Sequence, residues 1–351
     1  MDALSHHHHL CAGIFVAASD LHPDLLVFDG LVLTSGGRRE LELMRAGGLT
    51  AANFTCSVWE GFRPTMERIA RWKMSLAANA DLVRPVLTAA DLRAAKREGR
   101  IGVVLGWQNA SAIEDQIPFI QLFHDVGVRV VQLTYNTQNL IGCGCYEARD
   151  SGLTGFGHEV VEELNRVRML IDLSHVGPKT SEEAIAASHL PVCYSHVAAR
   201  ALKDHPRNKS DEQLRAIAEK GGFVGVTFFT TFMARGMDAT LDDFLDVVEH
   251  IIGVMGEEGV GFGTDARQRY EAWSIYWEDY TEADPPYWTH DKGYARQLTT
   301  FAPQRRPAAF VDYASYGALT AAMEARGWPE SRIRRVMGEN WVRFLGDVWG
   351  A

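Results

Sequence analysis

Eight short runs of apolar, β-prone residues are spread along the chain, and segments with helical patterning lie between most of them. Most runs are continuously apolar, which is typical of strands buried on both faces of a parallel sheet. Eight such strands with helical connections favour a closed β/α barrel over an open doubly wound sheet. The expected strands are Leu25–Phe28, Leu49–Phe54, Ile101–Gly106, Val128–Thr134, Met169–Leu173, Pro191–Tyr194, Phe223–Phe228 and Val260–Gly263.

Helices are expected where apolar residues recur at helical spacing between these runs. Ser210 followed three residues later by Gln213 is a helix-start signature of this kind. No G-x-G-x-x-G follows an early strand, so a dinucleotide-binding fold has no support. The expected helices are Gly61–Asn79, Ala89–Arg97, Ile113–Asp125, Phe156–Val167, Ser181–Ser188, Ser210–Lys220, Leu241–Met255 and Glu330–Val348.

No low-complexity linker divides the chain, so we predict one barrel domain over residues 25–351 and an N-terminal tail over residues 1–24. The tail contains His6–His9, which we exclude from the site. Residues 267–316 are irregular and rich in Trp, Tyr and Pro. Because they follow the last expected strand, they would lie over the barrel mouth as a lid, as ordinary packing or as a homodimer contact.

Composition limits the kinds of partner that the chain is expected to bind. The chain has 351 residues, 46% hydrophobic and 23% charged, and a soluble domain of this size folds without metal or disulfide staples. Any metal would therefore serve chemistry. A net charge of −10 without a basic run argues against nucleic-acid and membrane partners. The apolar stretch Leu10–Ala18 is too short to span a bilayer and has no preceding Lys or Arg, so we expect no secretory signal.

Five cysteines, an odd number, are scattered along the chain. That pattern is not a disulfide framework and favours a reducing compartment, so we expect a cytoplasmic protein. Cys143 and Cys145 form a C-x-C pair in a glycine-rich loop, but one such pair is a weak indication of metal or redox chemistry.

Polar residues just past the carboxyl ends of barrel strands converge on one mouth, where the active sites of such barrels lie. His175 and His196 follow two consecutive strands, each directly after a Ser. Two imidazoles from neighbouring strands can meet one zinc ion. Asp265, after the last strand, would be a further ligand or a general base. The full set at strand ends is Gln108, Asn109, Tyr135, Asn136, His175, His196 and Asp265.

Several segments make a family resemblance specific. Ile-Asp-Leu-Ser-His175-Val-Gly, Tyr-Ser-His196-Val-Ala-Ala-Arg, His-Pro-Arg207-Asn-Lys-Ser-Asp, Gly-Gly-Phe-Val-Gly-Val and Gly-Phe-Gly-Thr-Asp265 resemble the core motifs of the membrane (renal) dipeptidase family, in the family's order. The resemblance runs from about Leu25 to Val348 and implies a zinc hydrolase on a β/α barrel. It implies that His175 and His196 hold one ion, that Asp265 lies beside the nucleophilic water, and that Arg207 binds the substrate carboxylate.

The chain also departs from the family pattern. The family's first strand ends in Asp-Gly-His-x-Asp, and the two metal ligands of that motif fall on Leu31 and Leu33 here. The family's bridging Glu falls on Gln108, and its substrate-contacting His falls on Tyr135. We therefore expect the second metal site to be absent and one divalent ion, most simply Zn²⁺, to remain.

Our interpretation is a dipeptidase-like metallohydrolase acting on a small amide or dipeptide-like substrate with a free carboxylate. Asp265 and Tyr135 would be catalytic, with Asp265 as base and Tyr135 supporting the oxyanion. Arg207, Asn136 and Gln108 would bind substrate. Two alternatives stay open: a metal-free barrel that binds a small carboxylate ligand without hydrolysing it, and a metal-dependent lyase or other non-peptidase. We expect weak or undetectable hydrolysis of simple dipeptides.

Overall fold

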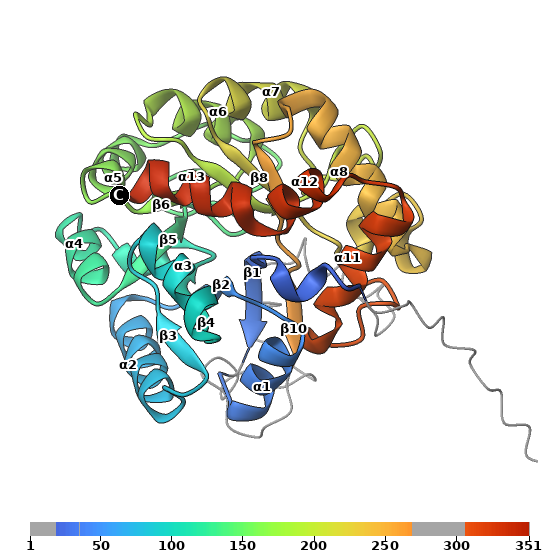
Figure 1. The fold of residues 1–351 in the computed structure, drawn as a ribbon. Helices are drawn as coiled ribbons and strands as arrows, with labels where there is room; N and C mark the ends of the chain where they lie inside the picture. The colour runs from blue at the N-terminus through green and yellow to red at the C-terminus, as the bar shows by residue number, and fades with distance from the viewer. Residues whose placement is uncertain (1–18, 35, 269–305, 351) are drawn as a thin grey trace, which may run out of the picture.

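The computed structural model describes residues 19–34, 36–268 and 306–350, and its centre is one curved sheet (Figure 1). All strand pairings within the sheet are parallel. A short strand, β3 (Val83–Pro85), pairs with the first three residues of β4. In spatial order the other strands are β10 (Ala266–Gln268), β1 (Phe28–Thr34), β2 (Ala51–Ser57), β4 (Ile101–Trp107), β5 (Val128–Gln132), β6 (Leu170–Asp172), β7 (Cys193–Val197), β8 (Phe223–Val226) and β9 (Val260–Phe262).

The sheet closes on itself through the last two strands. β9 pairs with β8, β10 pairs with β1, and only residues 263–265 separate β9 from β10. At this point the backbone N–H of Thr264 donates to Asp29 (2.7 Å) and that of Asp265 donates to the carbonyl oxygen of Leu31 (3.0 Å). β9 and β10 are therefore two halves of an eighth barrel strand, and the β/α barrel expected from the sequence is confirmed.

Helices cover the outside of the barrel (Figure 1). They pack on the sheet through a continuous apolar core that contains most of the buried Val, Leu, Ile and Phe side chains. Their bounds are α1 (Arg38–Ala46), α2 (Phe62–Ala78), α3 (Ala89–Glu98), α4 (Pro118–Asp125), α5 (Gly155–Arg166), α6 (Pro178–Ala187), α7 (Asp211–Glu219), α8 (Leu241–Met255), α11 (Tyr316–Ala325), α12 (Glu330–Arg334) and α13 (Asn340–Trp349).

The last helix closes one end of the barrel interior. α13 lies across the barrel face that Figure 1 shows toward the viewer. Its Trp341 packs against Phe28 and Phe223 inside the ring and donates its indole N–H to the carbonyl oxygen of Phe262 (3.0 Å). A Cβ at Gly225 would lie 2.0 Å from the carbonyl oxygen of Ser195, so only glycine fits in this layer. The carboxyl ends of the strands lie at the opposite end, which leaves that end as the mouth.

Several boundaries differ from the sequence expectation. The first strand begins at Phe28, where we expected it to end, because polar Asp29 and Gly30 interrupt the apolar pattern inside the true strand. The expected helix from Ile113 begins only at Pro118, since Glu114 adopts a left-handed φ of 55° that ends the preceding turn. α1, α11 and β3 were not expected. The final helix is broken between α12 and α13 by a wider turn over Arg335–Glu339.

The expected tail and aromatic loop fall mostly outside the described residues. Residues 1–18 and 269–305 are among those that the structure does not describe. From residue 19 the chain lies on the barrel: the His22 ring contacts the hydroxyl of Thr320 (2.7 Å) and the carbonyl oxygen of Gly47 (2.8 Å). Among the helices described, none is both long enough and apolar enough to cross a membrane.

Candidate functional site

The two strand-end histidines face each other at the mouth. His175 follows β6, His196 lies near the end of β7, and both side chains are buried. Their Nε2 atoms are 2.9 Å apart. The spacing places both rings where one small cation, a proton or a metal ion, would lie between two nitrogen lone pairs.

Outer hydrogen bonds set which nitrogen of each ring carries its proton. His175 Nδ1 lies 2.6 Å from Asn136 Oδ1, an acceptor, so His175 donates there. His196 Nδ1 lies 2.7 Å from the hydroxyl of Ser195, and that hydroxyl donates to Asp172. A hydroxyl that gives its proton to a carboxylate accepts from the imidazole. Both Nε2 atoms then present lone pairs, which is how metal-binding histidines are oriented by their outer partners.

The carboxylate behind this arrangement is fully buried. Asp172 accepts from the backbone N–H and the hydroxyl of Ser174 (3.0 and 2.6 Å) and from the backbone N–H of Ser195 (3.0 Å), besides the Ser195 hydroxyl. One carboxylate therefore fixes the ends of β6 and β7, from which the two histidines project.

Burial keeps the histidine pair neutral. The pKa of His175 is lowered well below its usual range, first by desolvation and then by the charges of Arg207, His196 and Lys209. The pKa of His196 is lowered in the same way, by desolvation and then by Arg207 and Lys209. Neutral imidazole is the form that binds metal.

Arg207 lies against the pair. Its guanidinium is buried, donates to the backbone carbonyls of Ser174 and His196, and approaches His175 Nε2 to 3.2 Å. In the described part of the chain no carboxylate pairs with it, and its Nε has no hydrogen-bond partner. Two acidic residues close to Arg207 in the sequence, Asp204 and Asp211, pair with Arg200 and His250 instead.

Lys209 is a second buried cation that we did not predict. Its Nζ donates to the carbonyl oxygen of Val176 (3.0 Å) and lies 4.8 Å from the centre of the Tyr194 ring. Burial lowers its pKa to about 7. Lys209 follows Arg207 in the same motif, but its burial depends on the fold of the loop after β7, and residue spacing does not reveal it.

An apolar wall continues from the histidines across the mouth. The Tyr135 ring stacks on the His175 ring at 4.1 Å between centres, and Trp59 meets Tyr135 edge-on at 5.2 Å. Leu33, Trp59 and Tyr135 are half-buried and pack around buried Val58. The sequence pointed to Tyr135 and to the apolar residue Leu33 at this position, but it gave no indication of Trp59.

The other predicted site residues are Gln108 and Asp265. Gln108 is buried and donates from its amide to the hydroxyl of Thr55 (3.0 Å). Asp265 is half-buried with a left-handed φ of 53°, in the closure between β9 and β10. Among the residues that the structure describes, no three His, Cys, Asp or Glu side chains are grouped to hold a metal. The ligand and base roles of Asp265 therefore stay predictions.

Asp29 holds the barrel closure from inside. Besides the Thr264 backbone N–H, its fully buried carboxylate accepts from the hydroxyls of Thr264 (2.6 Å) and Tyr316 (2.7 Å) and from the Leu31 N–H (3.2 Å). Desolvation nevertheless raises the pKa of Asp29 to about 6. Because Asp265 directly follows Thr264, this network fixes the backbone from which the predicted base projects.

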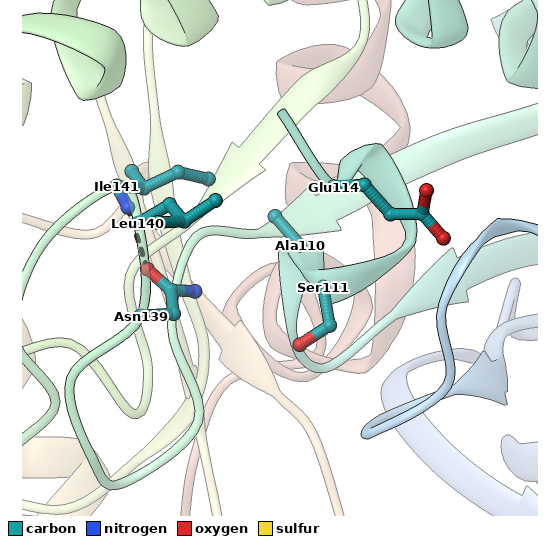
Figure 2. A pocket seen from close by; sticks show the side chains of 6 residues that line it. All are labelled: Ala110, Ser111, Glu114, Asn139, Leu140 and Ile141. Carbon is teal, nitrogen blue, oxygen red and sulfur yellow. Dashed lines mark hydrogen bonds between the residues drawn. The ribbon is translucent and has the colours of Figure 1, made fainter. Parts of the chain in front are cut away.

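A separate pocket of about 350 Å³ lies between two loops that follow β4 and β5 (Figure 2). Figure 2 shows the turn from Ala110 to Glu114 after β4 and the loop from Asn139 to Ile141 after β5 on its two sides. The Asn139 side chain holds the loop in place, because it accepts from the Ile141 N–H and donates to Asn109 Oδ1. The pocket contains none of the predicted catalytic side chains, so we do not place the chemistry there.

Fold and site together define a β/α barrel with a buried histidine pair at its mouth. The model of the membrane dipeptidase family (peptidase family M19) matches residues 33–283, and the chain belongs to that family. An uncharacterized dipeptidase of Schizosaccharomyces pombe is 34% identical over 210 residues, which are 58% of this chain and 50% of that protein. The chain thus spans about half the length of this relative.

Two solved structures complete the comparison. An amidohydrolase from Pseudomonas aeruginosa is 50% identical, with a TM-score of 0.87 over 95% of this chain and 99% of that chain. A metallopeptidase from Rhodobacter sphaeroides, liganded with a phosphinate mimic of the dipeptide L-Ala-D-Ala, is 22% identical, with a TM-score of 0.77 over 93% of this chain and 99% of that chain. The resemblance seen in the sequence is confirmed.

Proposed function

We propose that this chain hydrolyses a small, dipeptide-like amide that carries a free carboxylate, with one divalent metal ion at His175 and His196. One observation carries the proposal: two imidazole lone pairs face each other 2.9 Å apart beside a buried guanidinium. The imidazoles suit a cation and the guanidinium suits an anion. A hydrolase for a carboxylate-bearing amide needs both.

The histidine pair suits one metal ion. Tetrahedral zinc with Zn–N bonds of about 2.0–2.1 Å holds its two nitrogens about 3.4 Å apart. The observed 2.9 Å therefore needs an opening of about 0.5 Å, which small ring rotations provide. When bound, the ion supplies Lewis-acid polarisation and a more acidic water. The second ion has no support, because Leu31 and Leu33 stand at its expected ligand positions.

Arg207 and Asn136 are proposed to bind the substrate carboxylate. Each contacts the His175 ring, and each has a buried N–H group without a partner among the described residues: Nε of Arg207 and Nδ2 of Asn136. Unpaired buried donors are costly, and a carboxylate would satisfy both. The dipeptide mimic bound by the Rhodobacter sphaeroides protein supports this substrate class.

The proposed roles of the other residues follow from their places. Asp265 takes the proton of the attacking water, and the Asp29 network holds its backbone. Tyr135 supports the developing oxyanion with its hydroxyl, next to the His175 ring on which it stacks. Gln108, held by its bond to the Thr55 hydroxyl, is proposed to bind the substrate.

A metal-free barrel that binds a carboxylate ligand is the second candidate. The cations Arg207 and Lys209 beside the pair disfavour a dication. This candidate predicts ligand binding without metal and without turnover.

The test uses the full chain with His6–His9 changed to Ser, so that the histidine run cannot bind metal. We expect one tightly bound Zn²⁺ per chain by elemental analysis, and hydrolysis of carboxylate-bearing amides that the ion restores after chelation. His175→Ala should lose both, and His158→Ala, on the exposed face of α5, should keep both. Carboxylate binding without metal or turnover would establish the second candidate instead.

A further inference from the structure

We propose that the substrate is an N-acylated amino acid, and that its apolar acyl group lies on the acyl wall formed by Leu33, Val58, Trp59 and Tyr135. This inference rests on the proposed function, because it names the substrate of the same site. The wall, the histidine pair and Arg207 are the three parts of the argument.

The acyl wall is an apolar surface at the mouth. Leu33 lies near the end of β1, Val58 and Trp59 follow β2, and Tyr135 follows β5, so the wall is built from three strand ends. Trp59 and Tyr135 meet edge-to-face at 81°, which holds both rings in fixed orientations. Half-buried apolar side chains in a barrel mouth favour an apolar ligand group.

The wall is continuous with the proposed reaction centre. Tyr135 stacks on His175 with only 24° between the ring planes, and His175 Nε2 faces both His196 and Arg207. The order across the mouth is therefore wall, histidine pair, guanidinium. An N-acyl amino acid has the same order: acyl chain, scissile amide, carboxylate.

Charge separates this substrate from a free dipeptide. A dipeptide would bring an α-ammonium group to the wall, and burying an ammonium requires a carboxylate partner. Glu60, the acidic residue next to Trp59, already pairs with Arg68 (2.8 Å) and accepts the backbone N–H groups of Val58 and Trp59. Asp29 and Asp172 are buried inside the barrel and occupied by the donors described above.

The reaction balances with water alone. Water adds to the acyl carbonyl carbon, the C–N bond breaks, and the nitrogen takes a proton to leave as the free amino acid. The acyl group leaves as a fatty or aromatic carboxylate. Asp265 is the proposed carrier of the proton between water and nitrogen.

The test compares N-acetyl-, N-butanoyl- and N-hexanoyl-alanine with alanyl-alanine, each with the L and the D form of the carboxyl-terminal residue. Each methylene buried on the wall should raise kcat/KM about fourfold. Hexanoyl-alanine should therefore exceed acetyl-alanine by at least tenfold, and alanyl-alanine should be the poorest substrate. Trp59→Ala should flatten the chain-length dependence. Leu140→Ala, an exposed residue of the separate pocket, is the matched control and should leave it unchanged.

Leu33→Asp adds a carboxylate to the acyl wall and should shift the preference toward alanyl-alanine. Preferred hydrolysis of alanyl-alanine by the unmodified chain, or rates independent of acyl length, would overturn the inference while the proposed function stands. If none of these compounds is hydrolysed, calorimetry measures their binding instead. Binding of hexanoyl-alanine that weakens in Trp59→Ala supports the acyl wall and refutes the hydrolase, and equal binding of hexanoyl- and acetyl-alanine refutes the wall.

Discussion

The Nε2 atoms of His175 and His196 face each other at 2.9 Å, and both Nδ1 atoms are held by partners outside the pair. The outer partners decide what the pair can do. With the Nδ1 protons given to Asn136 and to the Ser195–Asp172 relay, the space between the rings has two acceptors and no proton of its own. A cation is the species that such a space stabilises.

Metal and carboxylate should bind cooperatively. Arg207 and Lys209 repel a divalent ion at the pair, and a bound carboxylate offsets the charge of Arg207. We expect Zn²⁺ to bind at least about fivefold more tightly with N-acetylalanine present, the low end of coupling between ligand sites. Calorimetric titration with and without the ligand measures this. Equal affinities would show that the carboxylate binds away from Arg207.

Removal of the guanidinium should weaken carboxylate binding. We expect Arg207→Ala to reduce affinity for N-acetylalanine by about 2–4 kcal/mol, as for loss of one partner of a buried charge pair. Arg207→Lys should recover only part of it, because an ammonium lacks the bidentate geometry. Arg200→Ala, on an exposed residue, is the control. Unchanged affinity in Arg207→Ala would mean that this side chain serves the backbone of Ser174 and His196 alone.

The missing ligands can be restored. Leu31→His, Leu33→Asp and Gln108→Glu together put metal-binding groups at the positions where the family has them. A second ion should bind, and hydrolysis of simple dipeptides should rise by at least tenfold, or about 1.4 kcal/mol of barrier. Elemental analysis and dipeptide turnover measure the two effects. Strong dipeptide hydrolysis by the unmodified chain would contradict the one-metal site.

Asp29 should make the free energy of unfolding fall as pH rises, which is opposite to the effect of a carboxylate whose pKa is lowered by an ion pair. Its pKa is about 6 in the fold against an ordinary 3.8, so between these values the folded chain holds a proton that the unfolded chain has lost. Its contribution is complete below about pH 4 and falls by about 3 kcal/mol as pH rises to about 6. Denaturant unfolding from pH 4 to 7 should show this fall for the unmodified chain relative to Asp29→Asn.

Asp81 provides the control for that measurement. It is exposed, and its ion pair with Arg38 lowers its pKa, so its contribution is present at higher pH and is lost on acidification. Relative to Asp81→Asn the unmodified chain should therefore gain stability as pH rises. The same sign for both variants would show that Asp29 is ionised throughout, held by its four donors.

Lys209 should cost stability at neutral pH. Its pKa of about 7 lies below the ordinary 10.5, so the unfolded chain holds more protons between these values and stability rises with pH across that window. Lys209→Met removes a buried cation and should stabilise the fold at pH 7 by about 1–4 kcal/mol. Urea unfolding at pH 7 and pH 10 should show a smaller gain at pH 10. Lys220→Met, on an exposed lysine, should show neither effect.

Sequence patterning predicted the barrel well because its strands are buried on both faces and its helices are amphipathic. It placed α8 at its observed bounds, Leu241–Met255. It failed where tertiary contacts override pattern: β1 contains Asp29 and Gly30, whose places depend on Thr264 and Trp341. Such partners lie hundreds of residues away along the chain, and local periodicity carries no information about them.

The site was only partly accessible from sequence. Histidines on consecutive strands were expected to meet, and the structure brings His175 and His196 together. The burial of Lys209 and the contact of Trp59 with Tyr135 depend on how loops fold over the strand ends. Residue type and spacing do not specify those paths.

The bond between Asp29 and Thr264 joins residues 235 positions apart, at the seam where the barrel closes. During synthesis, β1 therefore leaves the ribosome long before its final neighbour β10 exists. Until then the growing sheet has two unpaired edges, which are templates for wrong pairing. Long-range closure of this kind also slows folding. The hydrogen bonds between Asp29 and Thr264 thus form only when the barrel closes, and closure ends the period in which nascent chains are exposed to aggregation.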